Sequence, residues 1–296
     1  MESAINPNKL TISDFLKLIR FKNLAIMVFT QYLVRLFLIG PKADWLTNAT
    51  DFNLFLLSIA TITIGAAGYI INDYYDIKID TINKPDRVVI GRSLSRRGAM
   101  ALHIVLSGIG IAIGVYFYWV VPVGWKVLVG CFVAVFWLWL YSNQLKRMPF
   151  WGNLSVAFLT VMAIEGVNAL YDTNNLLVHM FAIFAFFVSV IREIVKDMED
   201  LRGDMHFGCK TLPIVWGIRK TKVFIFIILG MFIVATLMML FMISSWVLNY
   251  YFAAMTIPIA YFIYKLYWAD TKRAYRHLSN FCKWFMLTGI LMMIFT

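Results

Sequence analysis

Nine apolar runs divide this chain and constrain its fold more than any other feature. They lie near residues 22–41, 54–72, 99–121, 125–141, 154–171, 176–195, 223–243, 246–267 and 281–296. A helix needs about 20 mostly apolar residues to cross a bilayer. Apolar residues make up 61% of the chain and charged residues 15%, whereas a soluble domain has about 45–50% and about 25%. The sequence therefore predicts an all-α polytopic membrane protein with about nine transmembrane helices.

The basic residues alternate between the loops that join these runs. Of 27 Lys and Arg residues, all but Arg35, Lys42 and Lys126 lie in the N-terminal segment or in the loops after the even-numbered runs, counted together with the adjoining ends of the runs. Cytoplasmic loops of membrane proteins carry an excess of such residues. We therefore expect a cytoplasmic N-terminus, with residues 1–18 as a cytoplasmic segment, and a C-terminus outside. The net charge of +11 follows from this topology, and basic residues spread over five loops favour no nucleic-acid partner.

The acidic residues are concentrated in two short segments, which follow the second and the sixth apolar run. Each segment carries three aspartates spaced by three and four residues: Asp73, Asp76 and Asp80 in the first, and Asp197, Asp200 and Asp204 in the second. A helix places residues with this spacing on one face. The second triad repeats the first after four spans. This repeat predicts two pseudo-repeated four-helix halves around a central cavity.

Three carboxylates on one helix face repel one another, and carboxylates near a bilayer are costly. A divalent cation relieves both effects. Mg²⁺ prefers oxygen ligands and is commonly bound by one or two carboxylates together with substrate phosphates. Two triads facing each other across Mg²⁺ would form a diphosphate clamp. The alternative for any one aspartate is a solvated helix end with ordinary salt bridges, but that alternative explains two matched triads poorly.

Three motifs occur in order along the chain. The first reads Asn72-Asp73-x-x-Asp76-x-x-x-Asp80 followed by Asn83-x-Pro85-x-Arg87. The connector reads Tyr141-Ser142-x-x-Leu145-Lys146-Arg147 followed by Gly152-Asn153. The last reads Asp197-x-x-Asp200-x-x-x-Asp204-x-x-x-Gly208-x-Lys210-Thr211-Leu212-Pro213. Together with Arg20 and Asn23 they resemble the UbiA-type intramembrane prenyltransferases, and the resemblance runs from about residue 16 to the end.

The resemblance implies one transmembrane prenyltransferase domain over residues 1–296, with cytoplasmic cap loops at 73–97 and 197–220. It implies Mg²⁺-dependent transfer of a prenyl group from a polyprenyl diphosphate. The transfer would pass through an allylic carbocation and release diphosphate. The implied Mg²⁺ ligands are Asn72, Asp73, Asp76, Asp80, Asp197, Asp200 and Asp204, of which Asp73, Asp76, Asp197 and Asp200 would be catalytic.

Residues near the aspartates are candidates for the diphosphate and for the carbocation. The candidates for contacting the diphosphate, or for orienting the groups that do, are Asn72, Arg20, Asn23, Arg87, Lys146, Lys196 and Lys210. Each basic residue among them has an alternative explanation as a topology signal without substrate contact. Tyr141 is the candidate for stabilising the carbocation, because aromatic faces attract cations without reacting with them. Lys78 is expected to point away from the aspartate face.

The sequence indicates the prenyl acceptor less directly than it indicates the diphosphate donor. The segments NKPDR, VKDMED and KTLPI look most like the family branch that makes digeranylgeranylglyceryl phosphate, which implies geranylgeranyl diphosphate and geranylgeranylglyceryl phosphate as substrates. An aromatic acceptor of naphthoate, hydroxybenzoate or homogentisate type stays open, as does a secondary transporter, which would place acidic residues near the membrane midplane. We expect membrane lipids but no obligate protein as partners, and an active site on the cytoplasmic side of the plasma membrane. Arg35 and Glu165, which lie within apolar runs, could pair or contact the acceptor.

Overall fold

The computed structural model describes residues 10–83, 85, 88–242 and 246–296. Nearly all of them are helical, and within these ranges no β-strand occurs. The α-helices are α1 (Ile12–Leu18), α2 (Phe21–Leu33), α3 (Trp45–Ala49), α4 (Phe52–Asn83), α5 (Arg96–Val120), α6 (Gly124–Asn143), α7 (Trp151–Tyr171), α8 (Leu176–His206), α9 (Leu212–Met242), α10 (Trp246–Trp268) and α11 (Lys272–Leu291). Short π- or 3-10 helices are η1 (Val34–Leu38), η2 (Lys42–Asp44), η4 (Leu145–Arg147) and η5 (Met292–Phe295).

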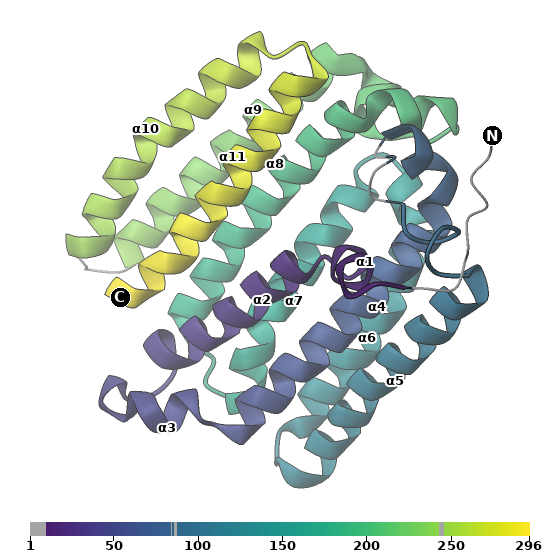
Figure 1. Cartoon of the computed structure of the whole chain (residues 1–296). Coiled ribbons are helices and arrows are strands. Elements are labelled where there is room, and N and C mark those ends of the chain that lie inside the picture. The colour runs from purple at the N-terminus through teal and green to yellow at the C-terminus, as the bar shows by residue number, and fades with distance from the viewer. Residues whose placement is uncertain (1–9, 84, 86–87, 243–245) are drawn as a thin grey trace. The chain divides into compact units, whose positions relative to one another are not determined.

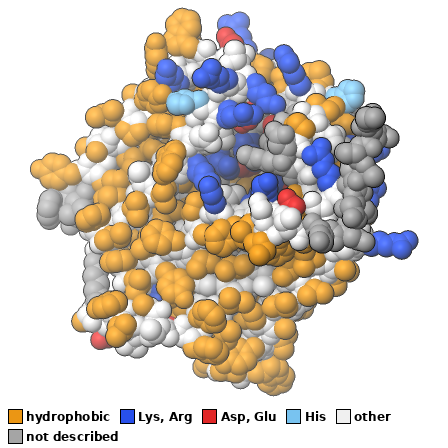
Figure 2. Space-filling view, viewed as in Figure 1, with side chains coloured by type: hydrophobic (Ala, Val, Ile, Leu, Met, Phe, Trp, Pro, Cys, Tyr) orange, Lys and Arg blue, Asp and Glu red, His pale blue; other side chains and the backbone are white. Residues whose placement is uncertain are grey.

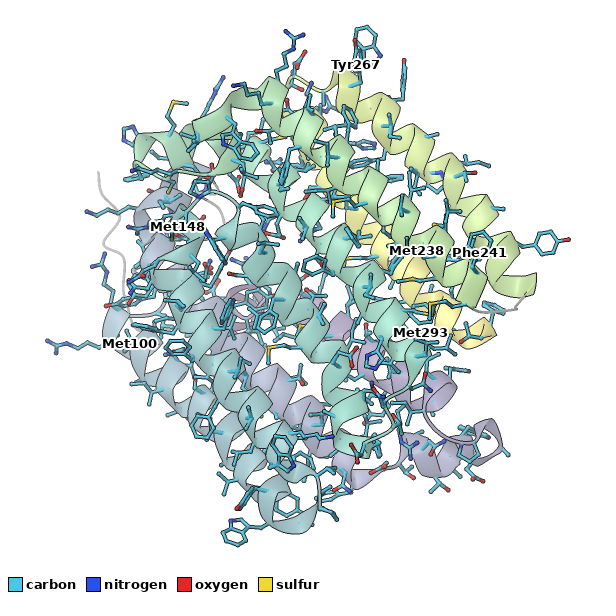
Figure 3. The ribbon with its side chains drawn as sticks, turned by 180° about the vertical axis from the view of Figure 1, so that it is seen from behind. Met100, Met148, Met238, Phe241, Tyr267 and Met293 are labelled. Atoms are coloured by element: carbon cyan, nitrogen blue, oxygen red, sulfur yellow. The ribbon has the colours of Figure 1, made fainter. Side chains whose placement is uncertain are left out.

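Each of the nine predicted apolar runs is mainly helical over its described residues. Eight helical segments among the described residues are long and apolar enough to cross a membrane. The run at 246–267 forms α10, which contains Pro258 and is not one of those eight. Hydrophobic side chains cover much of the face in Figure 2, and large ones such as Phe241 and Tyr267 (Figure 3) are exposed. Because a lipid-facing surface needs such exposure, the prediction of an all-α multi-pass membrane protein is confirmed.

The chain forms two compact units. The first comprises Met1–Tyr32, Leu46–Leu145 and Gly166–Thr173, and the second comprises Leu33–Trp45, Lys146–Glu165 and Asn174–Thr296. In the first unit α4 packs against α5 and α6. In the second unit α8 packs against α9 and α11, and α10 lies beside α9 and α11 (Figure 1). Each unit thus contains one long helix that carries an aspartate triad.

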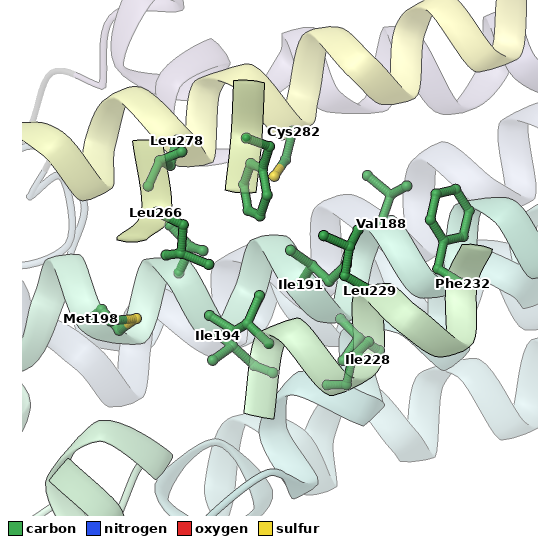
Figure 4. Packing of buried hydrophobic residues seen from close by; sticks show 14 of the residues in the cluster. Val188, Ile191, Ile194, Met198, Ile228, Leu229, Phe232, Leu266, Leu278 and Cys282 are labelled. Atoms are coloured by element: carbon green, nitrogen blue, oxygen red, sulfur yellow. The ribbon is translucent and has the colours of Figure 1, made fainter. Parts of the chain in front are cut away.

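The core of the second unit shows how α8 is oriented. Apolar residues at three- and four-residue spacing on α8 face its neighbours (Figure 4), and they include Val188, Ile191, Ile194 and Met198. Their partners include Ile228, Leu229 and Phe232 of α9, Leu266 of α10, and Leu278 and Cys282 of α11. An amphipathic helix that buries one stripe in this way leaves its other face to polar residues. The aspartate triad of α8 lies on that other face.

The aspartate helices are longer than the apolar runs that predicted them. The cap loops expected at 73–97 and 197–220 are correspondingly shorter, since residues 73–83 belong to α4 and residues 197–206 to α8. No proline interrupts either helix before its end. α4 ends two residues before Pro85, because a proline disfavours helical geometry in the residue before it. α8 ends just before Gly208, whose φ of +69° is a common way to close a helix.

Candidate active site

Arg20 lies in the turn between α1 and α2. Its φ of 51° is in the left-handed region, which costs a non-glycine residue about 1–2 kcal/mol. The turn directs the guanidinium towards α4, where Nη2 donates a hydrogen bond to Oδ1 of Asp73 at 2.8 Å. Strained backbone of this kind is concentrated at functional sites. The structure therefore brings Arg20 into contact with the first aspartate of the predicted triad.

Tyr69, one helical turn before Asp73, completes this cluster. The guanidinium carbon of Arg20 lies 4.7 Å from the Tyr69 ring centroid, and the Tyr69 hydroxyl accepts a hydrogen bond from Nδ2 of Asn23 at 3.3 Å. Burial disfavours the charge of Arg20, but Asp73, Tyr69, Asp80 and Tyr141 together outweigh this effect, so the pKa of the guanidinium is raised. The cluster therefore holds a permanent cation beside the first aspartate.

The other predicted ligands of this segment are half-buried on α4. Asn72 hydrogen-bonds Asp73, and the charge of Asp76 also acts on Asp73. Asp80 is close enough to interact electrostatically with Arg20. The first triad and Arg20 therefore form one electrostatic group.

Two further predictions concern the same segment. Lys78 is exposed, whereas the three aspartates are half-buried. This difference agrees with the expectation that Lys78 points away from their face. Arg87 lies outside the described residues.

The predicted residues of the connector motif and of the loop after α8 have different surroundings. Tyr141, near the end of α6, interacts electrostatically with Arg20. Lys146 is half-buried in η4. The backbone N–H of Lys210 donates to the carbonyl of Arg147 at 2.9 Å, while the Lys210 side chain is exposed. The connector and the loop after α8 are thus joined through their backbones.

The second triad has a different partner. Nδ2 of Asn153, near the start of α7, donates a hydrogen bond to Oδ2 of Asp197 at 2.8 Å. Asn153 is only 4% exposed. Asp73 is therefore held by a cation, Arg20, and Asp197 by a neutral amide. Sequence reasoning placed Asn153 in the connector motif but did not assign it to an aspartate.

One helical turn before Asp197 on α8, the buried carboxylate of Glu193 pairs with two cations. Glu193 is 6% exposed and accepts hydrogen bonds from Nη1 of Arg192 at 2.7 Å and from Nζ of Lys196 at 2.8 Å. Lys196 was predicted to contact the diphosphate or to orient the groups that do, whereas Arg192 and Glu193 were not predicted as site residues. Charged residues inside an apolar run are the signal that could have identified them.

The remaining aspartates of α8 lie further along the helix. Asp200 and Asp204 are both half-buried, and the charge of Asp204 acts on Asp197. On the same helix Glu199 accepts a hydrogen bond from Nε of Arg276 of α11 at 2.9 Å. The three aspartates predicted for the second triad are therefore on one helix, as their spacing indicated.

The structure also gives partners to Arg35 and Glu165. Nδ1 of His179 lies 2.8 Å from Oε1 of Glu165, and Nε2 of the same ring lies 3.0 Å from Oδ1 of Asn174. Nη1 of Arg35 donates to the carbonyl of Ile39 at 2.7 Å. Both residues therefore have polar partners within the second unit.

The side-chain atoms that could act as metal ligands determine which metal could bind here. Across the described ranges, no three His, Cys, Asp or Glu side chains form a ready-made metal cluster. The aspartates and Asn72 offer oxygen atoms, which Mg²⁺ prefers, and Mg²⁺ commonly needs only one or two carboxylates with phosphate oxygens completing its shell. The residues therefore fit Mg²⁺ bound together with a phosphate ligand.

Comparison with known proteins agrees with this chemistry. Residues 30–288 match the model of the UbiA prenyltransferase family. The digeranylgeranylglyceryl phosphate synthase of Thermococcus gammatolerans is 36% identical over 180 residues, which are 59% of this chain and 61% of that protein. Matches to two further proteins of the same name span 53% and 63% of their own lengths. This chain thus matches somewhat more than half the length of these relatives.

Solved structures share the fold. One, from work on digeranylgeranylglyceryl phosphate synthase in membranes, has a TM-score of 0.69 at 24% identity and covers 96% of this chain and 99% of its own. Another, a UbiA homologue from Archaeoglobus fulgidus bound to GPP and Mg²⁺, has a TM-score of 0.68 at 14% identity and covers 96% and 100%.

Proposed function

Since this chain belongs to the UbiA prenyltransferase family, we propose that it transfers a prenyl group from a polyprenyl diphosphate to a lipid acceptor with the help of Mg²⁺. The observation that carries the proposal is the pair of helices α4 and α8, each bearing three aspartates at matched spacing. In each triad the first aspartate is already held by a partner, Arg20 or Asn153. The same observation favours an enzyme over a transporter, because the acids lie towards the ends of long helices.

The first step is the departure of diphosphate. The bond between C1 of the donor and the diphosphate oxygen breaks, and the electron pair leaves with the diphosphate. Asp73, Asp76, Asp197 and Asp200 would hold Mg²⁺, which when bound neutralises the developing charge on the leaving group. Arg20, Lys146 and Lys210 supply further positive charge for the same purpose.

The second step forms the product. The allylic cation is stabilised by an aromatic face, and Tyr141 is the best candidate because the face of Tyr69 already carries Arg20. The acceptor hydroxyl oxygen then bonds to C1, and its proton passes to the released diphosphate. Exclusion of water from the apolar surroundings protects the cation from hydrolysis.

We assign geranylgeranyl diphosphate as donor and geranylgeranylglyceryl phosphate as acceptor. This assignment rests on the curated relatives, which are named digeranylgeranylglyceryl phosphate synthase, and on the sequence segments of that branch. The Mg²⁺ assignment is supported by the Archaeoglobus fulgidus homologue bound to GPP and Mg²⁺. An aromatic acceptor is the competing possibility.

The location of the reaction follows from the basic loops. We place the N-terminus and both aspartate triads on the cytoplasmic side of the plasma membrane, in one transmembrane domain over residues 1–296. A polar diphosphate is then bound at the water interface while its tail lies in lipid. The cytoplasm is where such a diphosphate and Mg²⁺ are available.

The test is an assay on the purified protein in detergent. It is given Mg²⁺, labelled geranylgeranyl diphosphate and a panel containing geranylgeranylglyceryl phosphate and aromatic acceptors, and the products are identified. Asp76→Ala and Asp200→Ala are each expected to lower turnover at least about 100-fold, the scale for losing one electrostatic contact to a transition state. Lys78→Ala, on the exposed side of α4, is the control and should stay within about twofold. Normal rates in both aspartate variants, or no product with any acceptor, would contradict the proposal.

A further inference from the structure

Two cations of α8 share one buried carboxylate. Glu193 is paired with Arg192 at 2.7 Å and with Lys196 at 2.8 Å. A buried carboxylate must be paired to be tolerated, but one cation would suffice. The second cation leaves the cluster with a net charge of +1 inside a membrane-spanning segment. Ionisable residues in such a position commonly mark a substrate site.

The guanidinium of Arg192 has hydrogen-bonding capacity left over. It carries five N–H donors, and Nη1 is engaged by Glu193. Its Nε is buried and has no acceptor within the part of the chain that the structure describes. Leaving a buried donor unsatisfied is costly. An anion that brings an oxygen atom to this position would therefore be bound favourably.

Both cations can still be reached. Their side chains are 26% and 29% exposed for Arg192 and Lys196, whereas that of Glu193 is 8% exposed. Glu193 therefore lies beneath them and fixes their positions. Holding flexible side chains in place before a ligand arrives reduces the entropy lost on binding.

These cations lie beside the aspartates of the same helix. Arg192, Lys196 and Asp200 are spaced by four residues and share a face of α8, and the charge of Lys196 acts on Asp197. The cluster therefore adjoins the second triad, and a phosphate on the two cations would lie within about one helical turn of Asp200.

We propose that Arg192 and Lys196, positioned by Glu193, bind the phosphate of the lipid acceptor. The inference rests on the proposed function, because it names the part of the acceptor that this second site recognises. A phosphate monoester carries a charge of about −1.5 to −2 at pH 7. Arginine suits bidentate contacts with phosphate oxygens, and lysine adds a point charge. An acceptor without a phosphate gains nothing from this cluster.

The test compares geranylgeranylglyceryl phosphate with the same lipid lacking its phosphate. In Arg192→Ala and in Lys196→Ala, kcat/KM for the phosphorylated acceptor should fall about 100-fold, as expected for losing a charge-assisted contact. The preference for the phosphorylated acceptor should largely disappear. A rise in KM for geranylgeranyl diphosphate with the preference intact would instead assign the cluster to the donor and overturn the proposal. Direct calorimetric binding of the phosphorylated lipid, without donor or Mg²⁺, should weaken in parallel.

Arg276→Ala is the matched control. Arg276 also pairs with a glutamate of α8, Glu199, but it is 58% exposed, so the preference should persist. If a folded Arg192→Ala or Lys196→Ala keeps both the preference and the affinity, the phosphate site is refuted. Lys196→Ala decides the matter if Arg192→Ala does not fold. Wild-type protein that prenylates only an aromatic acceptor would instead show that the acceptor assignment, and with it this site, is wrong.

Discussion

Replacement of Asn153 by alanine tests whether a neutral amide orients the second aspartate triad. The change removes the 2.8 Å hydrogen bond to Asp197 without adding charge or bulk. Asn153 is 4% exposed, so bulk water does not readily take its place. A hydrogen bond to a charged group contributes about 1.5–3 kcal/mol, and about 1.4 kcal/mol is tenfold in affinity. We therefore expect Mg²⁺ to act at about 10- to 150-fold higher concentration.

The assay follows diphosphate release against Mg²⁺ concentration at saturating donor. The half-saturating concentration should rise by this factor, and the rate should recover at high Mg²⁺ to within a few-fold of wild type, because Asp197 itself remains. Binding of Mn²⁺ together with a non-reactive donor analogue, measured by electron paramagnetic resonance, gives a readout independent of turnover. Ser155→Ala is the control, since its hydroxyl donates to the nearby carbonyl of Trp151 and makes no other hydrogen bond among the described residues. A folded Asn153→Ala with the Mg²⁺ dependence of wild type would refute the reasoning.

Two further changes test separate parts of the structure. Arg20→Ala removes the ion pair with Asp73 and should raise KM for the prenyl diphosphate at least about tenfold in steady-state kinetics, with Arg20→Lys in between; an unaltered KM would argue against phosphate binding by this residue. Gly289→Ala places a Cβ 2.3 Å from a ring carbon of Phe184 and should destabilise the protein by about 1–3 kcal/mol. Gly166→Ala, whose Cβ would meet nothing within 4 Å, should not, and equal melting temperatures of the two variants would contradict this packing argument.

Features that depend on local periodicity could be predicted from the sequence. The apolar runs are helical, and the spacing of Asp73, Asp76 and Asp80 does correspond to one helix face. Lys78 is exposed for the same geometric reason. The helix ends were harder to predict, because hydropathy shows where lipid contact ends and does not show where the helix ends.

Partners from distant parts of the chain could not be predicted in the same way. Asp197 and Asn153 are 44 residues apart, and only the tertiary fold brings the two side chains into contact. The link between Arg20 and Asp73 likewise depends on the left-handed turn before α2, which no pattern of residue types reveals. Glu193 differs from these cases, because its partners are one and three positions away and were visible in the sequence.

The continuity of α4 and α8 has a mechanical consequence. Their 32 and 31 residues correspond to about 48 and about 46 Å, whereas the hydrocarbon layer is about 30 Å thick. Each helix therefore extends without interruption from the hydrocarbon layer into water. An amphiphilic donor has to span the same two environments. An uninterrupted helix accommodates a thicker or thinner bilayer by tilting as a whole. The height of the carboxylates above the lipid is thus coupled to the thickness of the membrane, and lipid composition becomes one of the variables that set where the phosphates are bound.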